Sequence, residues 1–98
     1  MPSSRIIVGA RVATEVDFRV GGALADPTTV RCIINSPLVT LPITYEFPVA
    51  DMTRLGIGQY RFEFTVDSAG SWAIRWEGSG AVEGVDEAVM VVDPSAVL

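Results

Sequence analysis

Alternation of apolar and polar residues constrains the fold of this chain more than any other feature of its sequence. Between Arg11 and Val20, every second residue belongs to one largely apolar set: Val12, Thr14, Val16, Phe18 and Val20. The same period returns twice, with Tyr60, Phe62, Phe64 and Val66, and then with Trp72, Ile74 and Trp76. A period of two places successive side chains on opposite faces of a β-strand, so each segment has one face suited to a core.

Turn residues divide the chain into further strands. Glycine tolerates positive φ and proline cannot continue a central ladder, so Gly21-Gly22 and Asp26-Pro27 each end a strand. Strands are predicted at residues 6–8, 11–20, 29–35, 43–47, 58–66, 71–77 and 87–92. We expect a short hairpin turn at residues 67–70, a Gly-rich acidic loop at residues 78–86, and helix only as about one turn near residues 50–55.

These strands predict a single all-β domain over residues 1–98, with an N-terminal arm at residues 1–4 and a C-terminal tail at residues 94–98. Roughly seven short strands with regularly spaced turns are typical of an immunoglobulin-like antiparallel β-sandwich. No internal repeat or low-complexity linker divides the chain.

The residue types present argue against most kinds of catalytic site. The chain has no His and no Lys, which removes Ser-His-Asp and Cys-His designs, most transition-metal sites and Schiff-base chemistry. Pairs such as Glu77 with Glu83, or Asp86 with Glu87, are the remaining candidates for the acid and base of a glycosidase. Acids in a Gly-rich loop are usually only solvated, and the ordered spacing of a Ca²⁺ loop is missing. We therefore expect no enzyme, no cofactor and no metal site.

Charge and hydropathy also restrict the partners of the chain. Nucleic-acid binding relies on clustered cations, whereas seven Arg are scattered here among twelve acids, for a formal net charge of −5. The longest stretch without charge, residues 32–45, is interrupted by Asn35, Pro37 and Pro42, so no membrane span is predicted. The single cysteine, Cys32, is expected to be a small core residue, and the N-terminus lacks the apolar run of a secretory signal.

Two segments resemble a known group of proteins. Residues 58–80 read GQYRFEFTVDSAGSWAIRWEGSG and residues 18–30 read FRVGGALADPTTV. A Gly-x-Tyr opens one strand, Ala-Gly ends the turn, a Trp opens the next strand and Trp-Glu-Gly closes it. This pattern resembles small immunoglobulin-like proteins among the structural genes of tailed bacteriophages and prophages, and filamin-like sandwich repeats share its looser part. Family-like sequences often have a polar Pro-x-Gly hairpin after the third strand, whereas this chain has the apolar segment SPLVTLP at residues 36–42.

The two expected sheets differ in what they show to solvent. In such a sandwich, the second and fifth predicted strands share one sheet, and the third, sixth and last share the other. The outward residues of the first sheet are of mixed charge and can pair across strands: Arg11, Glu15, Asp17, Arg19, Arg61 and Glu63. The last strand, AVMVV at residues 88–92, is apolar on both faces, and one of those faces has no partner within the domain.

An uncovered apolar face on such a domain usually marks an interaction site. The expected protein interface consists of Ile33, Leu38, Leu41, Ala73, Met90, Val92, Val97 and Leu98. The alternative is that the N-terminal residues or the loop at residues 38–42 fold over this face.

The resemblance implies a virion structural protein, made in the bacterial host cytoplasm and bound on the head or at the head–tail junction. Its partners would be other phage structural proteins, namely capsid, neck or tail subunits, or a second copy of this chain. The alternative is an adhesion or receptor-binding module that recognises a host glycan or protein through its loops, such as residues 78–86. A small glycosidase is the third reading.

Overall fold

The structure is a computed structural model, and it describes residues 6–38 and 41–95. These residues form strands and turns, and none of them lies in a helix. The ten strands are β1 (Ile6–Ile7), β2 (Arg11–Asp17), β3 (Arg19–Val20), β4 (Ala23–Leu24), β5 (Thr29–Asn35), β6 (Ile43–Glu46), β7 (Met52–Gly56), β8 (Gln59–Thr65), β9 (Gly70–Ser79) and β10 (Gly84–Asp93).

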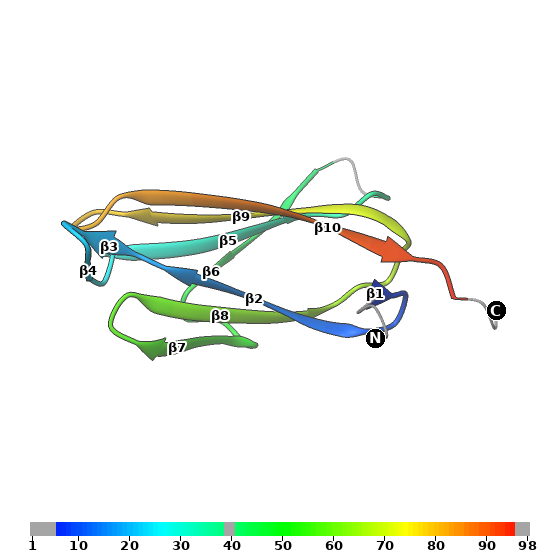
Figure 1. Ribbon diagram of the computed structural model, residues 1–98, viewed down its shortest axis with the longest axis horizontal. Helices are drawn as coiled ribbons and strands as arrows, with labels where there is room; N and C mark the ends of the chain where they lie inside the picture. The colour runs from blue at the N-terminus through cyan, green and yellow to red at the C-terminus, as the bar shows by residue number, and fades with distance from the viewer. Residues whose placement is uncertain (1–5, 39–40, 96–98) are drawn as a thin grey trace.

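Two sheets pack face to face, which confirms the prediction of an all-β sandwich. One sheet has the order β1-β10-β9-β5-β6 and the other has the order β2-β8-β7. The first forms the upper layer and the second the lower layer in Figure 1. The predicted assignment of strands to sheets is also confirmed, because β2 pairs with β8 while β5, β9 and β10 lie in the other sheet.

The core lies between the inner faces of the two sheets, where the alternating residues of the sequence meet. Its buried members are Val16, Phe18, Val30, Cys32, Ile34, Met52, Tyr60, Phe62, Val66, Trp72, Ile74, Trp76, Val82 and Val92. The indole Nε1–H of Trp76 crosses between the sheets and donates to Oγ1 of Thr14 at 3.1 Å. This hydrogen bond explains why a threonine occupies an inward position of β2, since a buried indole N–H needs an acceptor.

The segment predicted as one strand at residues 11–20 ends three residues earlier. Phe18 leaves the ladder, and its backbone N–H donates to the carbonyl oxygen of Gly58 at 2.7 Å. The chain then forms a separate hairpin of β3 and β4 around Gly21-Gly22, both of which have positive φ. Val20 is therefore 55% exposed in this hairpin and does not reach the core.

Four further expectations are corrected. Residues 50–55 form no helical turn, because Met52 is buried opposite Phe62 and β7 pairs with β8 at the sheet edge. Residues 67–70 close no hairpin, since they carry the chain from β8 in one sheet to β9 in the other. Most of the loop expected at residues 78–86 is strand, so only residues 80–83 connect β9 to β10. Finally, β1 pairs in parallel with the end of β10, so the sandwich is not purely antiparallel.

A carboxylate holds the loop before β5 against the β7–β8 turn. Asp26 accepts hydrogen bonds from Nη2 of Arg54 at 2.7 Å, from the backbone N–H of Gly58 at 2.8 Å and from the hydroxyl of Tyr60 at 3.2 Å. The Arg54 guanidinium and then the Gly58 N–H lower the pKa of Asp26 from 3.8 to about 2. Gly58 has a φ of 71° and lies against backbone atoms of Phe18 and Ala25, so a side chain has no room there.

Candidate functional site

The register of β10 decides which of its apolar side chains face solvent. Met90 lies opposite Trp72, whose side chain is in the core, and Val92 is only 2% exposed. Met90 packs against the core from the same face. The prediction that Met90 and Val92 belong to the exposed interface is therefore wrong, because their side chains lie on the inner face of the strand. Val89 and Val91 occupy the outer phase and are 71% and 62% exposed.

Val89 and Val91 form part of an apolar area on the outer face of the larger sheet. In register, Val89 lies beside Ala73 on β9, and Ala73 lies beside Asn35 on β5. A groove of about 270 Å³ runs over these strands and includes Ile33 and Pro42 in its lining. We call the set Ile33, Pro42, Ala73, Val89 and Val91 the outer patch. Of the predicted interface residues, Ile33 and Ala73 are thus brought together as expected.

The loop before β6 borders the outer patch and leaves it open. Leu38 and Leu41 are each 78% exposed, and Pro42 lines the groove. The described residues of this loop therefore do not cover Val89. The two residues of β1 do not cover it either, because they pair with Val92 and Asp93 at the far end of β10. The predicted interface residues Val97 and Leu98 lie outside the described residues.

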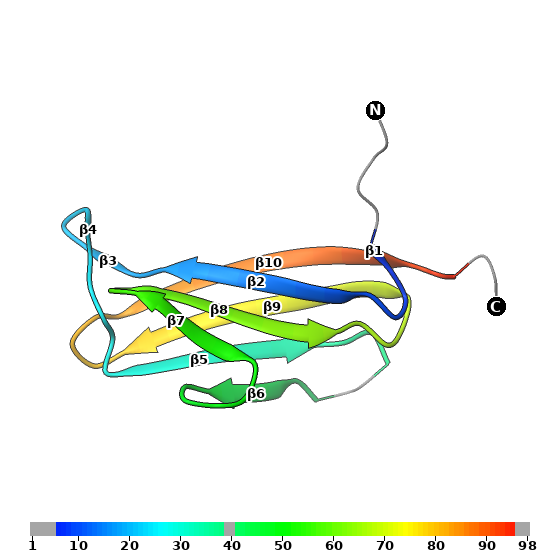
Figure 2. The ribbon, with the colours of Figure 1, turned by 90° about the horizontal axis from the view of Figure 1, so that it is seen from below.

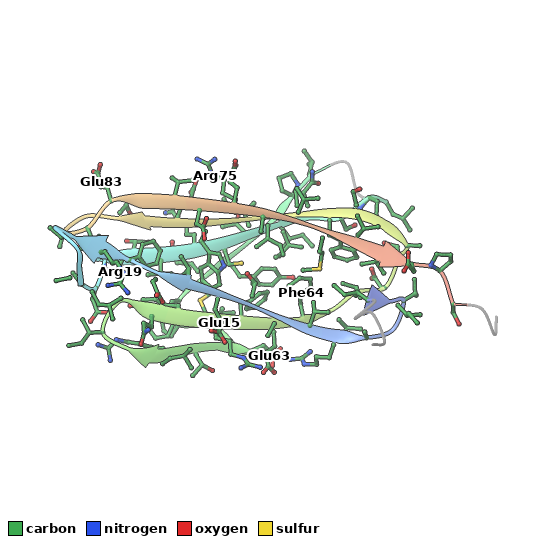
Figure 3. All side chains as sticks on the ribbon, in the orientation of Figure 1. Glu15, Arg19, Glu63, Phe64, Arg75 and Glu83 are labelled. Carbon is green, nitrogen blue, oxygen red and sulfur yellow. The ribbon has the colours of Figure 1, made fainter. Side chains whose placement is uncertain are left out.

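The other end of the same outer face is charged and satisfied within the domain. Arg75 binds Glu77 at 2.7 Å and Glu87 at 2.8 Å, and Arg31 binds Glu46 at 2.8 Å. Figure 3 shows the Arg75 side chain projecting outward from this layer. Exposed ion pairs contribute only about 0–1 kcal/mol each, but they leave these charges without need of a partner. The outer patch is therefore the part of this face that lacks a partner.

The outer face of the smaller sheet is solvated, as predicted from its mixed charges. Arg11 binds Asp51 at 2.8 Å, and Arg61 lies 3.2 Å from Glu63 and 3.5 Å from Glu15. Glu15 and Glu63 are labelled on this layer in Figure 3. Both outer faces thus carry ion pairs, and the larger sheet carries the outer patch in addition, whereas the smaller sheet exposes Leu55 on its edge strand β7.

The carboxylates considered for catalysis have ordinary structural surroundings. Glu77 is held by Arg75 on the sheet face, whereas Glu83 lies in the connection between β9 and β10. Burial raises the pKa of the Cys32 thiol to about 12, so this thiol stays protonated in the core. Within residues 6–38 and 41–95, no three His, Cys, Asp or Glu side chains gather so as to hold a metal ion.

Sequence reasoning missed Val89 and Val91. The only sequence signal that Val89 and Val91 face outward is that two acids, Glu87 and Asp93, lie on the same face of the strand as they do. Asp86, which alternation places on the opposite face, weakens that signal.

A second opening, of about 150 Å³, lies beside the core near the ends of β5 and β8, and Tyr45, Phe64 and Trp72 contribute to its lining. It was also not predicted, because its lining comes from the start of β6 and from the ends of two strands in different sheets, which no local residue pattern brings together.

Comparison of the chain with protein-family models, with curated proteins and with solved structures found no match. The part of the chain that the structure describes contains no helix long and apolar enough to cross a membrane.

Proposed function

We propose that this domain is a non-enzymatic, immunoglobulin-like accessory subunit of a tailed-phage virion, bound on the head or at the head–tail junction. Its site of synthesis would be the bacterial host cytoplasm. The Gly58/Tyr60 to Trp76-Glu77-Gly78 pattern supports the family. The strand order supports the fold type, since β2, β8 and β7 lie against β10, β9, β5 and β6 as in immunoglobulin sandwiches.

The observation that carries the proposal is the contrast between the two outer faces. The described cations of both faces have acidic partners, but the larger sheet also carries two exposed valines, Val89 and Val91, that no described residue covers. Binding a partner would bury these valines and remove apolar surface from water, which is the main favourable term in protein association. The neighbouring Leu38 and Leu41 would extend the contact.

An adhesion module is the less favoured function. Such a module would use loops at the end of the sandwich, and residues 78–86 were the main candidate. Only residues 80–83 form that connection, and Val82 within it is buried in the core. This leaves few exposed side chains there to recognise a glycan or protein.

The test is to measure how many copies of the domain enter particles. The tagged domain is produced in bacteria that assemble the particles, with Val89→Asp and Val91→Asp combined in one variant, and its copies per purified particle are counted by quantitative mass spectrometry. We expect the double variant to be folded and absent from particles, because a carboxylate at each position must be desolvated on docking.

The matched control combines Thr53→Asp with Leu55→Asp, which places the same two carboxylates at alternate exposed positions of the edge strand β7 on the smaller sheet. This variant should be incorporated as well as the natural chain. Absence of the natural chain from particles would refute the proposed function, and normal incorporation of the Val89→Asp/Val91→Asp variant would refute docking through the outer patch.

A further inference from the structure

Among residues 6–38 and 41–95, nothing pairs with the outer edge of β10 along most of its length. Its pairing with β9 runs from Gly84 to Val92, whereas β1 covers only Val92 and Asp93. Figure 2 shows β10 at the margin of its sheet, with β1 at one end. Among the described residues, no strand or loop makes a backbone hydrogen bond to the edge between Gly84 and Met90.

The direction of the free backbone groups follows from one hydrogen bond. The N–H of Val8 donates to the carbonyl oxygen of Asp93 at 3.0 Å, so the backbone of Asp93 faces the β1 side. Backbone groups alternate along a strand with the same period as side chains. Val85, Glu87 and Val89 therefore direct their N–H and C=O groups toward the open edge.

These residues also place their side chains on the outer face. Val85 and Val89 are 57% and 71% exposed, and Val89 belongs to the outer patch. An incoming strand would therefore gain backbone hydrogen bonds at the edge and apolar contacts on the same face. Both contributions are used when a peptide adds a strand to a sheet.

The charges at this edge select the kind of strand that can bind. Asp86 lies on the inner phase of β10, opposite Trp76 in register, yet it is exposed. Neither Asp86 nor Glu83 has an ion-pair partner among the described residues. Arg19 lines the same hollow as these two acids, but its guanidinium lies 3.6 Å from Asp17. An inward-pointing charge on an edge strand opposes pairing with most strands, but a cation opposite Asp86 would remove this barrier.

We infer that a partner protein adds an extended segment to the edge of β10, with apolar side chains on the outer face and an Arg or Lys opposite Asp86. A second copy of this chain fits less well, since it brings the same acids to the shared edge and each copy has a formal net charge of −5. This inference rests on the proposed function in that it specifies how the partner is held.

The probe is a synthetic peptide that alternates valine with arginine and is acetylated and amidated at its ends. Binding is measured by calorimetry and by the backbone amide NMR signals of β10. We expect saturable binding that shifts the signals of Val85, Glu87 and Val89. A peptide alternating valine with glutamate should bind roughly tenfold or more weakly, because its charge repels Asp86.

A chemical control isolates the backbone hydrogen bonds. The same peptide with all its backbone amides N-methylated keeps every side chain but loses the donors that face β10 in either strand direction, and we expect its binding to be lost. Equal binding of the methylated peptide would overturn the inference, because the patch would then bind side chains without strand addition.

The matched protein variants are Val89→Pro and Val89→Thr. Proline removes an N–H that points to the open edge and makes no bond to β9, a position where edge strands tolerate it, whereas threonine keeps that N–H. Val89→Pro should weaken binding of the arginine peptide roughly tenfold or more relative to Val89→Thr. If Val89→Pro fails to fold, Asp86→Arg serves instead and should reverse the preference to the glutamate peptide.

Two further outcomes separate this inference from the proposed function. Absence of peptide binding, or binding only after deletion of residues 1–5, would overturn strand addition by a partner, even where Val89→Asp/Val91→Asp abolishes incorporation into particles. Peptide binding as expected together with absence of the natural chain from particles would uphold strand addition and overturn the virion assignment.

Discussion

Adjacent substitutions on β10 should destabilise the domain to very different extents. Met90 packs against the core beside Trp72, whereas Val89 is 71% exposed on the outer face. Truncating a buried methionine costs about 2–5 kcal/mol, and a carboxylate adds a desolvation penalty. Because Met90 is only partly buried, we expect Met90→Asp to lower the free energy of unfolding by about 2–4 kcal/mol. Val89→Asp should lower it by about 1 kcal/mol or less, mainly through β-propensity.

Urea unfolding followed by tryptophan fluorescence measures both changes, since Trp72 and Trp76 are buried. With a slope of about 1–2 kcal/mol per M, Met90→Asp should lower the midpoint by at least about 1 M, and Val89→Asp by clearly less. Equal effects of the two variants, or a larger effect of Val89→Asp, would refute the assigned phase of β10. The outer patch and the strand-addition site would be refuted with it.

Three other substitutions test the contacts that hold the sandwich together. Thr14→Val removes the acceptor of the Trp76 indole N–H and should cost about 1–3 kcal/mol in urea unfolding, whereas Thr14→Ser should cost less; equal costs would contradict a role for the hydroxyl. Gly58→Ala places a Cβ 2.6 Å from the Phe18 carbonyl oxygen at a positive φ, so it should cost about 3 kcal/mol or more, and a neutral effect on the melting temperature would contradict that crowding. Because the folded state lowers the pKa of Asp26 from 3.8 to about 2, the stability from this carboxylate is present above pH 3.8 and is lost as pH falls toward 2. Asp26→Asn should therefore reduce the loss of stability over this pH window, and unchanged pH dependence would argue against the network.

Strands in which apolar and polar residues alternate over several positions were predictable, because burial of one face places an apolar residue at every second position. The inward sets of β2, β8 and β9 lie in or against the core as the alternation predicted, whereas Val20, beyond Phe18, lies in the β3–β4 hairpin and is exposed. Strand β7 was missed because it is an edge strand with a single buried side chain, Met52. A single buried residue gives no alternating pattern from which a strand could be predicted.

The connection between β8 and β9 shows a different limit. A short turn of Asp, Ser, Ala and Gly at residues 67–70 is compatible with a return to the same sheet or a crossing to the other. The two outcomes bury the same side chains of Phe64 and Trp72, so only the packing of the whole domain separates them. Topology of this kind is not recorded in local residue patterns.

The position of the candidate site on the larger sheet was predicted, but the residues of β10 that face outward were not. Ile33 and Ala73 lie on the outer face as expected, because polar neighbours determine the phase of β5 and β9. Residues 88–92 of β10 contain no polar residue, so both phases are equally apolar and the sequence could not distinguish Val89 from Met90. The register with Trp72 supplies that information.

The parallel pairing of β1 with β10 determines how the domain would respond to mechanical force. Ile6 lies opposite Val92, and the two strands run in the same direction. Tension applied through the two ends of the chain would pull these strands past each other along their axes. Their hydrogen bonds would then be loaded together in shear and would not open one at a time, so the first event on stretching would be the joint release of β1 from the sheet.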